Sequence, residues 1–359
     1  MVILRVSPDT GHHGKHLYFI LPEKISGWIA WSGALGDVPD EGDERGIGNH
    51  SMADSPRIID SDMNYESWRN GFLTFCVAML IGACQQGANP LQDKNDLFAR
   101  DNILAWCIVP YDAMERGPEE RAKMLRDMGI TMLAYDWREQ HIPTFDEEWE
   151  ALNNHGIKLQ AFWMVTGLDP AGDPTVERVF DFVERNDVNT QLWTYIVETE
   201  EFRAIDTEQK VEKVVEILAY LADRAERAQC QIGVYNHRGW LGEPENQVKI
   251  IDQLNRDNVG LVYNFHHAVG HHERFAEFFP LLVPHLMALN LAGIKSSDSI
   301  EFYGIGEGDA EYDMIRLVLE SDYRGPIGII NHDHKRDARQ GLLIEMAGLE
   351  KVLRAIGED

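Results

Sequence analysis

The sequence predicts an α/β protein built as a (β/α)8 TIM barrel, preceded by a largely unstructured N-terminal leader. From residue 102 onward, short apolar runs alternate with longer amphipathic runs, and we count eight such pairs. The apolar runs are nearly continuous, as in parallel strands that are covered on both faces. Eight βα units over roughly 250 residues match the size of one barrel of this type.

The eight predicted strands and eight predicted helices alternate along the chain. The strands are expected at 103–110, 130–137, 157–165, 190–197, 231–237, 259–265, 286–294 and 325–332. The helices are expected at 118–129, 146–156, 174–187, 206–229, 244–258, 272–286, 310–322 and 337–357. Several begin at Pro or Asp and end at Gly or Asn, which are typical of helix ends. An open doubly wound sheet is the alternative, but no glycine-rich phosphate motif follows the first strand.

Composition excludes several classes of protein. The 359 residues include 33 Lys and Arg against 60 Asp and Glu, a formal charge of −27, and 44% are hydrophobic. This apolar content predicts a folded core. The negative charge argues against nucleic acid as a partner, because binding a phosphate backbone requires clustered Lys and Arg. The four cysteines follow neither a zinc pattern nor a disulfide framework.

The N-terminal quarter has the pattern of an export signal. Residues 72–83, FLTFCVAMLIGA, are too few for a membrane-spanning helix, which needs about 20, but suit the apolar region of a signal peptide. The run leads into Cys84 and resembles a bacterial lipobox, in which the cysteine is lipidated. A buried helix with two incidental cysteines is the alternative. The lipoprotein interpretation predicts an exported protein, lipid-anchored to a bacterial membrane or periplasmic.

This interpretation divides the chain into four parts. Residues 1–62 are expected to be a disordered or upstream extension, with translation beginning at Met63. Residues 63–84 then form the signal segment, residues 85–101 a polar tether, and residues 102–359 the barrel.

The chemistry is expected at the C-terminal ends of the strands, where the active sites of such barrels lie. Histidines after the fifth, sixth and eighth strands suit acid–base work or metal binding. Buried asparagines need polar partners, and aromatic rings can stack on a sugar. The predicted catalytic residues are His237, His332 and Lys295; the predicted metal ligands are His237, His266, His267 and His332; and the predicted substrate-binding residues are Trp106, Tyr135, Asp136, Arg138, Trp163, Asn236, Asn264, Asn290 and Asn331.

From about residue 102 to 357 the sequence resembles the xylose isomerase-like barrel superfamily. The resemblance lies in GVYNHRGWLGEPENQVKII, VGLVYNFHHAVGHHERF, LMALNLAGIK and GPIGIINHDH. The superfamily includes sugar isomerases, epimerases, inosose dehydratases and endonucleases acting at abasic sites. The similarity is greatest to a secreted lipoprotein branch associated with sugar and keto-sugar metabolism. One barrel hosts many reactions, so this resemblance implies the fold more strongly than the reaction.

The resemblance also implies a divalent metal ion, but the ligand positions differ here. Familiar epimerases use Glu, Asp, His and Glu on strands five to eight. At the matching places this chain has Tyr235 or Asn236, Asn264, Asn290, and Asn331 or His332. An amide binds a hard cation more weakly than a carboxylate does. A softer site for Zn, Co, Ni or Mn, built from the histidines, is the metal-binding hypothesis.

The sequence therefore predicts an enzyme that removes a proton next to the carbonyl of a sugar or keto-sugar. Isomerisation, epimerisation and lyase or hydratase chemistry all share this step. A barrel that only binds carbohydrate, having lost the metal carboxylates, is the alternative. An abasic-site endonuclease is disfavoured by the charge, the predicted export and the missing carboxylates. The expected partner is a small sugar, with membrane contact only through a lipid on Cys84.

Overall fold

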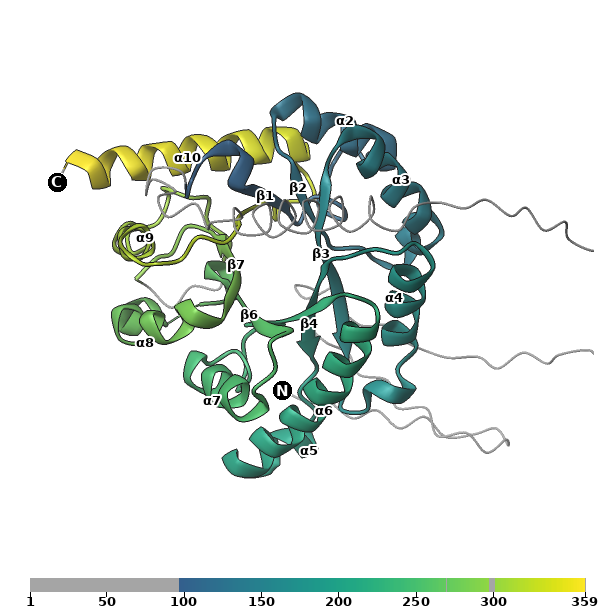
Figure 1. Ribbon diagram of the computed structural model, residues 1–359. Helices are drawn as coiled ribbons and strands as arrows, with labels where there is room; N and C mark the ends of the chain where they lie inside the picture. Colours follow the sequence, from purple (N-terminus) through teal and green to yellow (C-terminus); the bar gives the residue numbers. More distant parts are fainter. Residues whose placement is uncertain (1–96, 269, 297–300, 359) are drawn as a thin grey trace, which may run out of the picture. The chain divides into compact units, whose positions relative to one another are not determined.

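The computed structural model describes residues 97–268, 270–296 and 301–358. Within these ranges, eight parallel strands form a closed barrel in chain order (Figure 1). They are β1 (Ile103–Trp106), β2 (Met132–Tyr135), β3 (Lys158–Thr166), β4 (Gln191–Ile196), β5 (Gln231–Tyr235), β6 (Val259–Asn264), β7 (Leu286–Leu291) and β8 (Ile327–Ile330). β8 pairs with β1 from Ile103↔Ile327 to Trp106↔Ile330, which closes the sheet. The predicted barrel is confirmed, and the open-sheet alternative is wrong.

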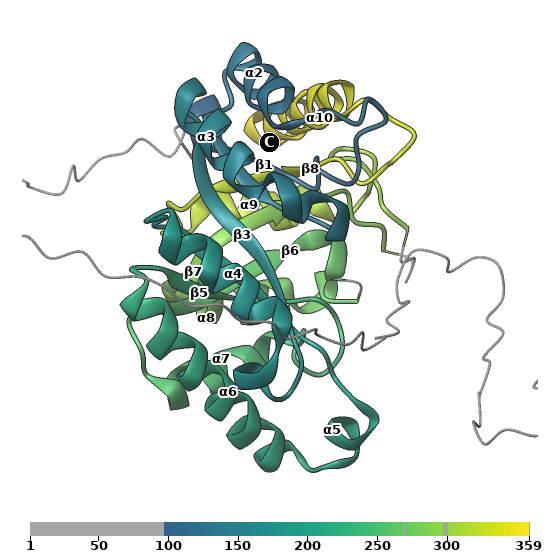
Figure 2. The same cartoon turned by 90° about the vertical axis from the view of Figure 1, so that its right-hand side faces the viewer.

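Helices surround the strands, as Figures 1 and 2 show from two directions. They are α2 (Pro118–Met128), α3 (Phe145–His155), α4 (Pro174–Arg185), α5 (Glu200–Ala204), α6 (Thr207–Arg227), α7 (Pro244–Leu254), α8 (Phe275–Leu282), α9 (Glu311–Glu320) and α10 (Ala338–Glu358). The eight predicted helices are confirmed. The five-residue α5 was not predicted, because a single turn is too short to show a helical period. No helix in the described ranges is long and apolar enough to cross a membrane.

Helix boundaries follow from local chemistry. α2 starts at Pro118, where no backbone donor is needed, and ends at Gly129, whose φ of 71° suits a residue without Cβ. α6 is capped by Asp206, which accepts from the Gln209 amide at 2.8 Å while Gln209 accepts from the Asp206 amide at 3.3 Å. These caps satisfy backbone groups that helix ends leave unpaired. They fix where each helix begins and therefore how each strand enters the barrel.

Large aromatic side chains fill the barrel interior. Trp106 lies 5.0 Å from Trp193, 5.7 Å from Trp163 and 6.1 Å from Tyr235, measured between ring centroids. The Trp106 indole donates to the Tyr235 hydroxyl at 3.0 Å, which joins β1 to β5 across the barrel. The Asn264 amide of β6 donates to the same hydroxyl. This hydroxyl therefore ties three strands together beneath the C-terminal end of the barrel.

Two buried carboxylates anchor the segment between β7 and α9. Glu311, fully buried at the start of α9, accepts from the amides of Gly306 at 3.0 Å, Gly308 at 2.9 Å and Ile294 at 3.1 Å. Glu345 of α10 accepts from the Ile305 amide at 2.8 Å. Burial, with Glu307 nearby, raises the pKa of Glu345 to about 8. The segment is therefore fixed to the two last helices of the barrel.

The hydroxyl that joins the three strands can be removed by Tyr235→Phe. We expect this variant to lose about 1–3 kcal/mol of unfolding free energy, because the buried Trp106 and Asn264 donors are left unpaired. Urea denaturation measures the loss. Tyr312→Phe on the outer α9 is the control, and we expect it to lie within about 0.5 kcal/mol of wild type. Equal stability of Tyr235→Phe and wild type would contradict this role.

The raised pKa of Glu345 predicts a pH-dependent stability. Between its unfolded value near 4.5 and its folded value of about 8, the native state holds a proton that the unfolded chain releases. The contribution of Glu345 to the free energy of unfolding therefore falls as the pH rises from 4.5 to 8. Above pH 8 it changes no further. Glu345→Gln keeps the acceptor for Ile305 but cannot ionise. The free energy of unfolding of the variant relative to wild type should rise from pH 6 to pH 9. A difference that does not change with pH would show that Glu345 keeps its ordinary pKa.

Candidate active site

Four histidines from three strands meet at the C-terminal end of the barrel. His237 follows β5, His266 and His267 follow β6, and His332 follows β8. The ring centroids lie 4.3 Å apart for His237 and His267, 4.9 Å for His266 and His267, and 4.9 Å for His266 and His332. All four side chains are partly buried. We call these four residues the histidine cluster.

Asparagines at the strand ends position the cluster. The Asn236 side chain donates to the Asn264 carbonyl at 3.1 Å and accepts from the Asn264 amide at 2.7 Å, which holds β5 against β6. The Asn264 side-chain oxygen in turn accepts from the His266 amide at 2.9 Å. This bond caps η5 (Phe265–His267), the 3-10 turn that carries His266 and His267. Both amide side chains are therefore engaged in holding the backbone beneath the imidazoles.

The other two predicted asparagines are also buried. The Asn331 side chain donates to the Tyr111 carbonyl and lies against Gly341 of α10, so it joins β8 to the β1–α2 loop. Asn290 lies against Gly328 of β8. A contact of these asparagines with substrate stays a prediction, since the structure shows them supporting the strand ends.

Aromatic side chains flank the cluster on both sides. His237 lies 4.4 Å from Tyr195 and 6.3 Å from Trp163. On the other side, His332 lies 4.3 Å from Tyr111 and 5.7 Å from Phe302. Phe302 also lies 5.5 Å from His266. The cluster is therefore enclosed by apolar ring faces, which suit the carbon-bound hydrogens of a sugar.

Sequence reasoning missed Tyr111 and Phe302. Neither residue stands at the end of a strand, because Tyr111 follows β1 by several residues and Phe302 lies in the long connection before α9. No periodic signal marks them. The Tyr111 carbonyl is held by Asn331, and the segment that follows Phe302 is held by Glu345 and Glu311.

Burial keeps the imidazoles uncharged at neutral pH. It lowers the pKa of His237 and of His332 to about 4, and the pKa of His266 to about 3. The pKa of His267 is also well below its usual range. The positive charge of Arg238 adds to burial at all four residues. The neutral imidazole is the form that accepts a proton, so the cluster offers general bases at neutral pH, although the lowered pKa values weaken them as bases.

Asp136 and Arg138 lie at the end of β2. Asp136 is buried and accepts from the Val109 amide at 3.3 Å, while Arg138 donates to the carbonyls of Asp136 at 2.6 Å and Trp137 at 2.8 Å. Burial raises the pKa of Asp136 to about 7. The nearby Arg138 opposes this shift. Arg138 also lies close enough to His332 for its positive charge to lower the pKa of His332.

Three other predicted residues make contacts with groups outside the cluster. Tyr135 packs between the strands and the helices, 5.9 Å from Phe145 and 5.4 Å from Phe162. Trp106 lies in the barrel interior, where it bonds Tyr235. Lys295 is exposed, with its ammonium 4.1 Å from the centre of the Tyr303 ring.

Glu198 after β4 is buried, although Glu200 and Glu201 beside it are exposed. The Glu198 carboxylate accepts from the Leu241 amide at 2.8 Å. The sequence around Glu198 gives no sign of this burial, because the loop that covers it comes from a distant segment, after β5.

The described residues do not fit a divalent metal ion of the familiar type. No group of three or more His, Cys, Asp or Glu side chains in the described ranges is arranged to hold one. The strand ends offer amides in place of carboxylates, and the oxygens of Asn236 and Asn264 already accept backbone hydrogen bonds. The arrangement of the described residues thus gives no support for a metal at His237, His266, His267 and His332, and metal binding there stays a prediction.

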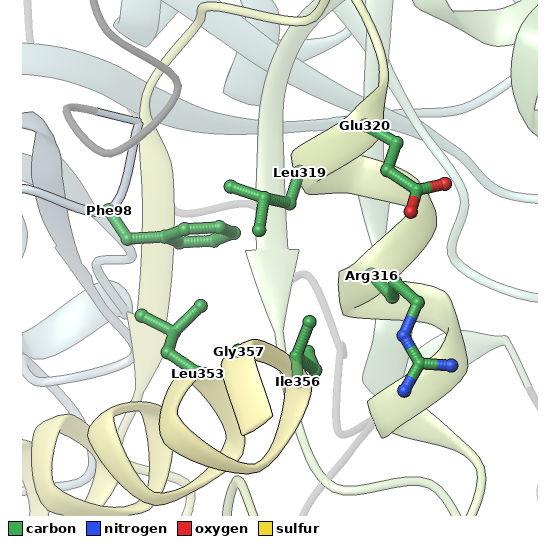
Figure 3. Close-up of a pocket in the computed structure, with 7 residues that line it drawn as sticks. All are labelled: Phe98, Arg316, Leu319, Glu320, Leu353, Ile356 and Gly357. Carbon is green, nitrogen blue, oxygen red and sulfur yellow. The ribbon is translucent and has the colours of Figure 1, made fainter. Parts of the chain in front are cut away.

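A separate hollow of about 570 Å³ lies between α9 and α10 (Figure 3). Phe98, Leu319, Leu353 and Ile356 point toward one another there, with Arg316 and Glu320 on α9 at the edge. Phe98 precedes β1, so this hollow lies toward the N-terminal ends of the strands. It contains no histidine, asparagine or aspartate.

Solved structures similar to this chain are TIM-barrel proteins of low sequence identity. The IOLI protein, solved with a zinc atom bound, is 17% identical with a TM-score of 0.56, covering 70% of this chain and 98% of its own. D-psicose 3-epimerase from Clostridium cellulolyticum H10, solved with D-tagatose, is 14% identical with a TM-score of 0.51, covering 71% and 98%. The probable 3-DHS dehydratase AsbF from Bacillus anthracis is 13% identical with a TM-score of 0.52, covering 69% and 98%. At these identities the likeness shows the fold alone.

No curated protein matches the sequence. The family model of the xylose isomerase-like TIM barrel matches residues 111–351, which include seven of the eight strands and the whole histidine cluster. With the closed eight-stranded barrel and the polar strand ends, this match establishes the family. The chain belongs to the xylose isomerase-like TIM barrel family.

Proposed function

We propose that this protein is an enzyme of carbohydrate conversion that removes a proton next to the carbonyl of a sugar or keto-sugar. The observation that carries the proposal is the contact of four neutral imidazoles at the end of the barrel where this fold places its active sites. Isomerisation, epimerisation and lyase or hydratase chemistry all begin with this step. The family supports the proposal, since the similar solved structures include an epimerase and a probable dehydratase.

We assign the proton transfer to His237 or His332 as part of this proposal. These residues stand at the two ends of the histidine cluster, and each lies beside an aromatic ring, Tyr195 for His237 and Tyr111 for His332. A sugar lying between the rings would present its carbon-bound hydrogens to an uncharged imidazole. Removal of one hydrogen leaves negative charge on the carbonyl oxygen, which imidazole N–H groups and nearby cations stabilise. Lys295, whose ammonium lies over the Tyr303 ring, stays a predicted catalytic residue.

Deuterium exchange tests the proposal directly. The protein is incubated in D₂O with a panel of sugars, 3-keto-sugars and sugar acids, and NMR follows the loss of the hydrogen next to the carbonyl. We expect exchange with at least one compound, and a loss of about 10²–10⁴-fold in His237→Gln or His332→Gln, the range typical of general acid–base groups. His285→Gln is the control, because His285 precedes β7 and lies at the opposite end of the strands.

Two results would overturn this proposal. One is the absence of exchange across the panel. The other is an equal loss of activity in the His285 control. If the protein binds sugar without turnover, and His332→Gln leaves the binding affinity unchanged, the result would instead support a barrel that only binds carbohydrate.

Elemental analysis of the purified protein separates a metal-free site from one that holds Zn, Co, Ni or Mn at the cluster.

We also propose that the protein is exported and anchored by a lipid on Cys84. The support is the sequence alone, because residues 63–84 lie outside the described residues. The segment combines one nearby cation, a short apolar run and a cysteine preceded by small residues, the pattern of a lipoprotein signal. The polar residues 85–96 would then connect the lipid to the barrel.

Cys84→Ser should prevent lipidation and release the protein from the membrane fraction of a bacterial host. Mass spectrometry of the wild type should show a mature chain that begins at a diacylated Cys84. Cys76→Ser, in the same segment, should behave as wild type. A mature chain that retains residues 1–83 would contradict the proposed export.

A further inference from the structure

The histidine cluster experiences positive charge, although the whole chain is strongly acidic. The formal charge of the chain is −27. Yet the positive charge of Arg238 lowers the pKa of all four imidazoles, and that of Arg138 also lowers the pKa of His332. Two guanidinium groups therefore act on the cluster, although the chain as a whole is acidic.

The carboxylates at the strand ends are occupied by the loops. Asp136 accepts from the Val109 amide and is buried, and Glu198 accepts from the Leu241 amide and is buried. Asp333, after β8, accepts from the Lys335 amide at 2.9 Å and lies 3.6 Å from the Arg336 guanidinium. Each of these groups is thus directed toward the backbone or a neighbouring cation.

Arg238 stands directly beside His237 and is exposed. Its backbone adopts a φ of 61°, and its amide donates to the Asn236 carbonyl at 2.8 Å. Gly239 follows with a φ of 70° and packs on the Glu198 carboxylate, where a Cβ would come within 2.6 Å of Oε1. A left-handed conformation is costly for a residue with a side chain and is maintained only where the surroundings enforce it. Here the buried Glu198 and the tight turn hold Arg238 at the end of β5.

The Arg238 guanidinium makes no hydrogen bond or ion pair with the described residues. Arg274 and Arg256, by contrast, are paired with Glu245 and Asp223. A guanidinium presents several donors in one plane and matches a carboxylate or phosphate in two parallel hydrogen bonds. An unpaired guanidinium beside a candidate base therefore offers a binding group for an anion.

We propose that the substrate carries a negatively charged group, a carboxylate or a phosphate monoester, and that Arg238 binds this group beside His237. This inference rests on the proposed function and narrows it to sugar acids or sugar phosphates. The field of an acidic protein repels anions at long range, so an anionic substrate needs a cation within the site. Arg238 supplies this cation next to the residue proposed to move the proton.

Binding measurements on the full chain test the proposal without relying on turnover. Calorimetry compares D-glucuronate, its neutral methyl ester, D-glucose 6-phosphate and D-glucose. We expect an anionic probe to bind the wild type and to lose roughly 10- to 100-fold in affinity in Arg238→Gln, as for loss of a charge-assisted hydrogen bond. Arg238→Lys should recover part of the affinity. The neutral probes should bind the wild type and both variants with the same affinity. If only one of the two anions binds, it shows whether the charged group is a carboxylate or a phosphate.

Arg227→Gln is the matched control, because Arg227 is an exposed arginine at the C-terminal end of α6, toward the other end of the strands. Its affinities should equal those of the wild type. Failure of both anions to bind, or equal binding by Arg238→Gln, would overturn the inference. Deuterium exchange on neutral sugars that is unaffected by Arg238→Gln would also overturn it, while supporting the proposed function. Anion binding that depends on Arg238, with no exchange on any compound, would instead support the inference and overturn the proposed function.

Discussion

Closure of the sheet is the constraint on which the site depends. β1 and β8 pair over four residues, and this brings together strand ends that are far apart in sequence. The hydrogen bond from Trp106 to Tyr235 crosses the interior and joins residues 129 positions apart. An open sheet would leave the residues after β8 far from those after β2. Only a closed barrel lets His332 lie near His266 on one side and near Arg138 on the other.

The chemistry of the site follows from what lies beneath it. The interior is filled by indole and phenol rings, so the imidazoles above them lose hydration and remain neutral. Hydrogen bonding at this level is used mainly to hold backbone, as Asn236 and Asn264 show. The side chains left to meet a substrate are imidazoles, aromatic faces and guanidinium groups. This set is suited to proton transfer on a compound that has both apolar carbon-bound hydrogens and negative charge.

Much of the fold could be predicted from sequence, because strands and helices carry periodic signals. Residues at the strand ends could be assigned to one end of the barrel by the rule for parallel sheets, which is why the four histidines could be grouped. The direction of a single side chain could not be predicted where the strand ends. Tyr135 and Asn331 stand at strand ends, yet they contact the outer helices and a neighbouring loop. Phe302 lies in a connection without a period, and its place depends on contacts made by distant helices.

The anchoring of the segment before α9 makes the last helix part of the site. Ile305 is bonded to Glu345 in the middle of α10, while Phe302, three residues earlier, forms a wall of the histidine cluster. A chain shortened before α10 would thus lose an outer helix and one wall of the site together. In chimaeras made with other barrels of this family, the seventh connecting segment and the C-terminal helix would have to be exchanged as one piece. The hydrogen bond from Ile305 to the buried carboxyl group of Glu345 is the reason that these two segments belong together.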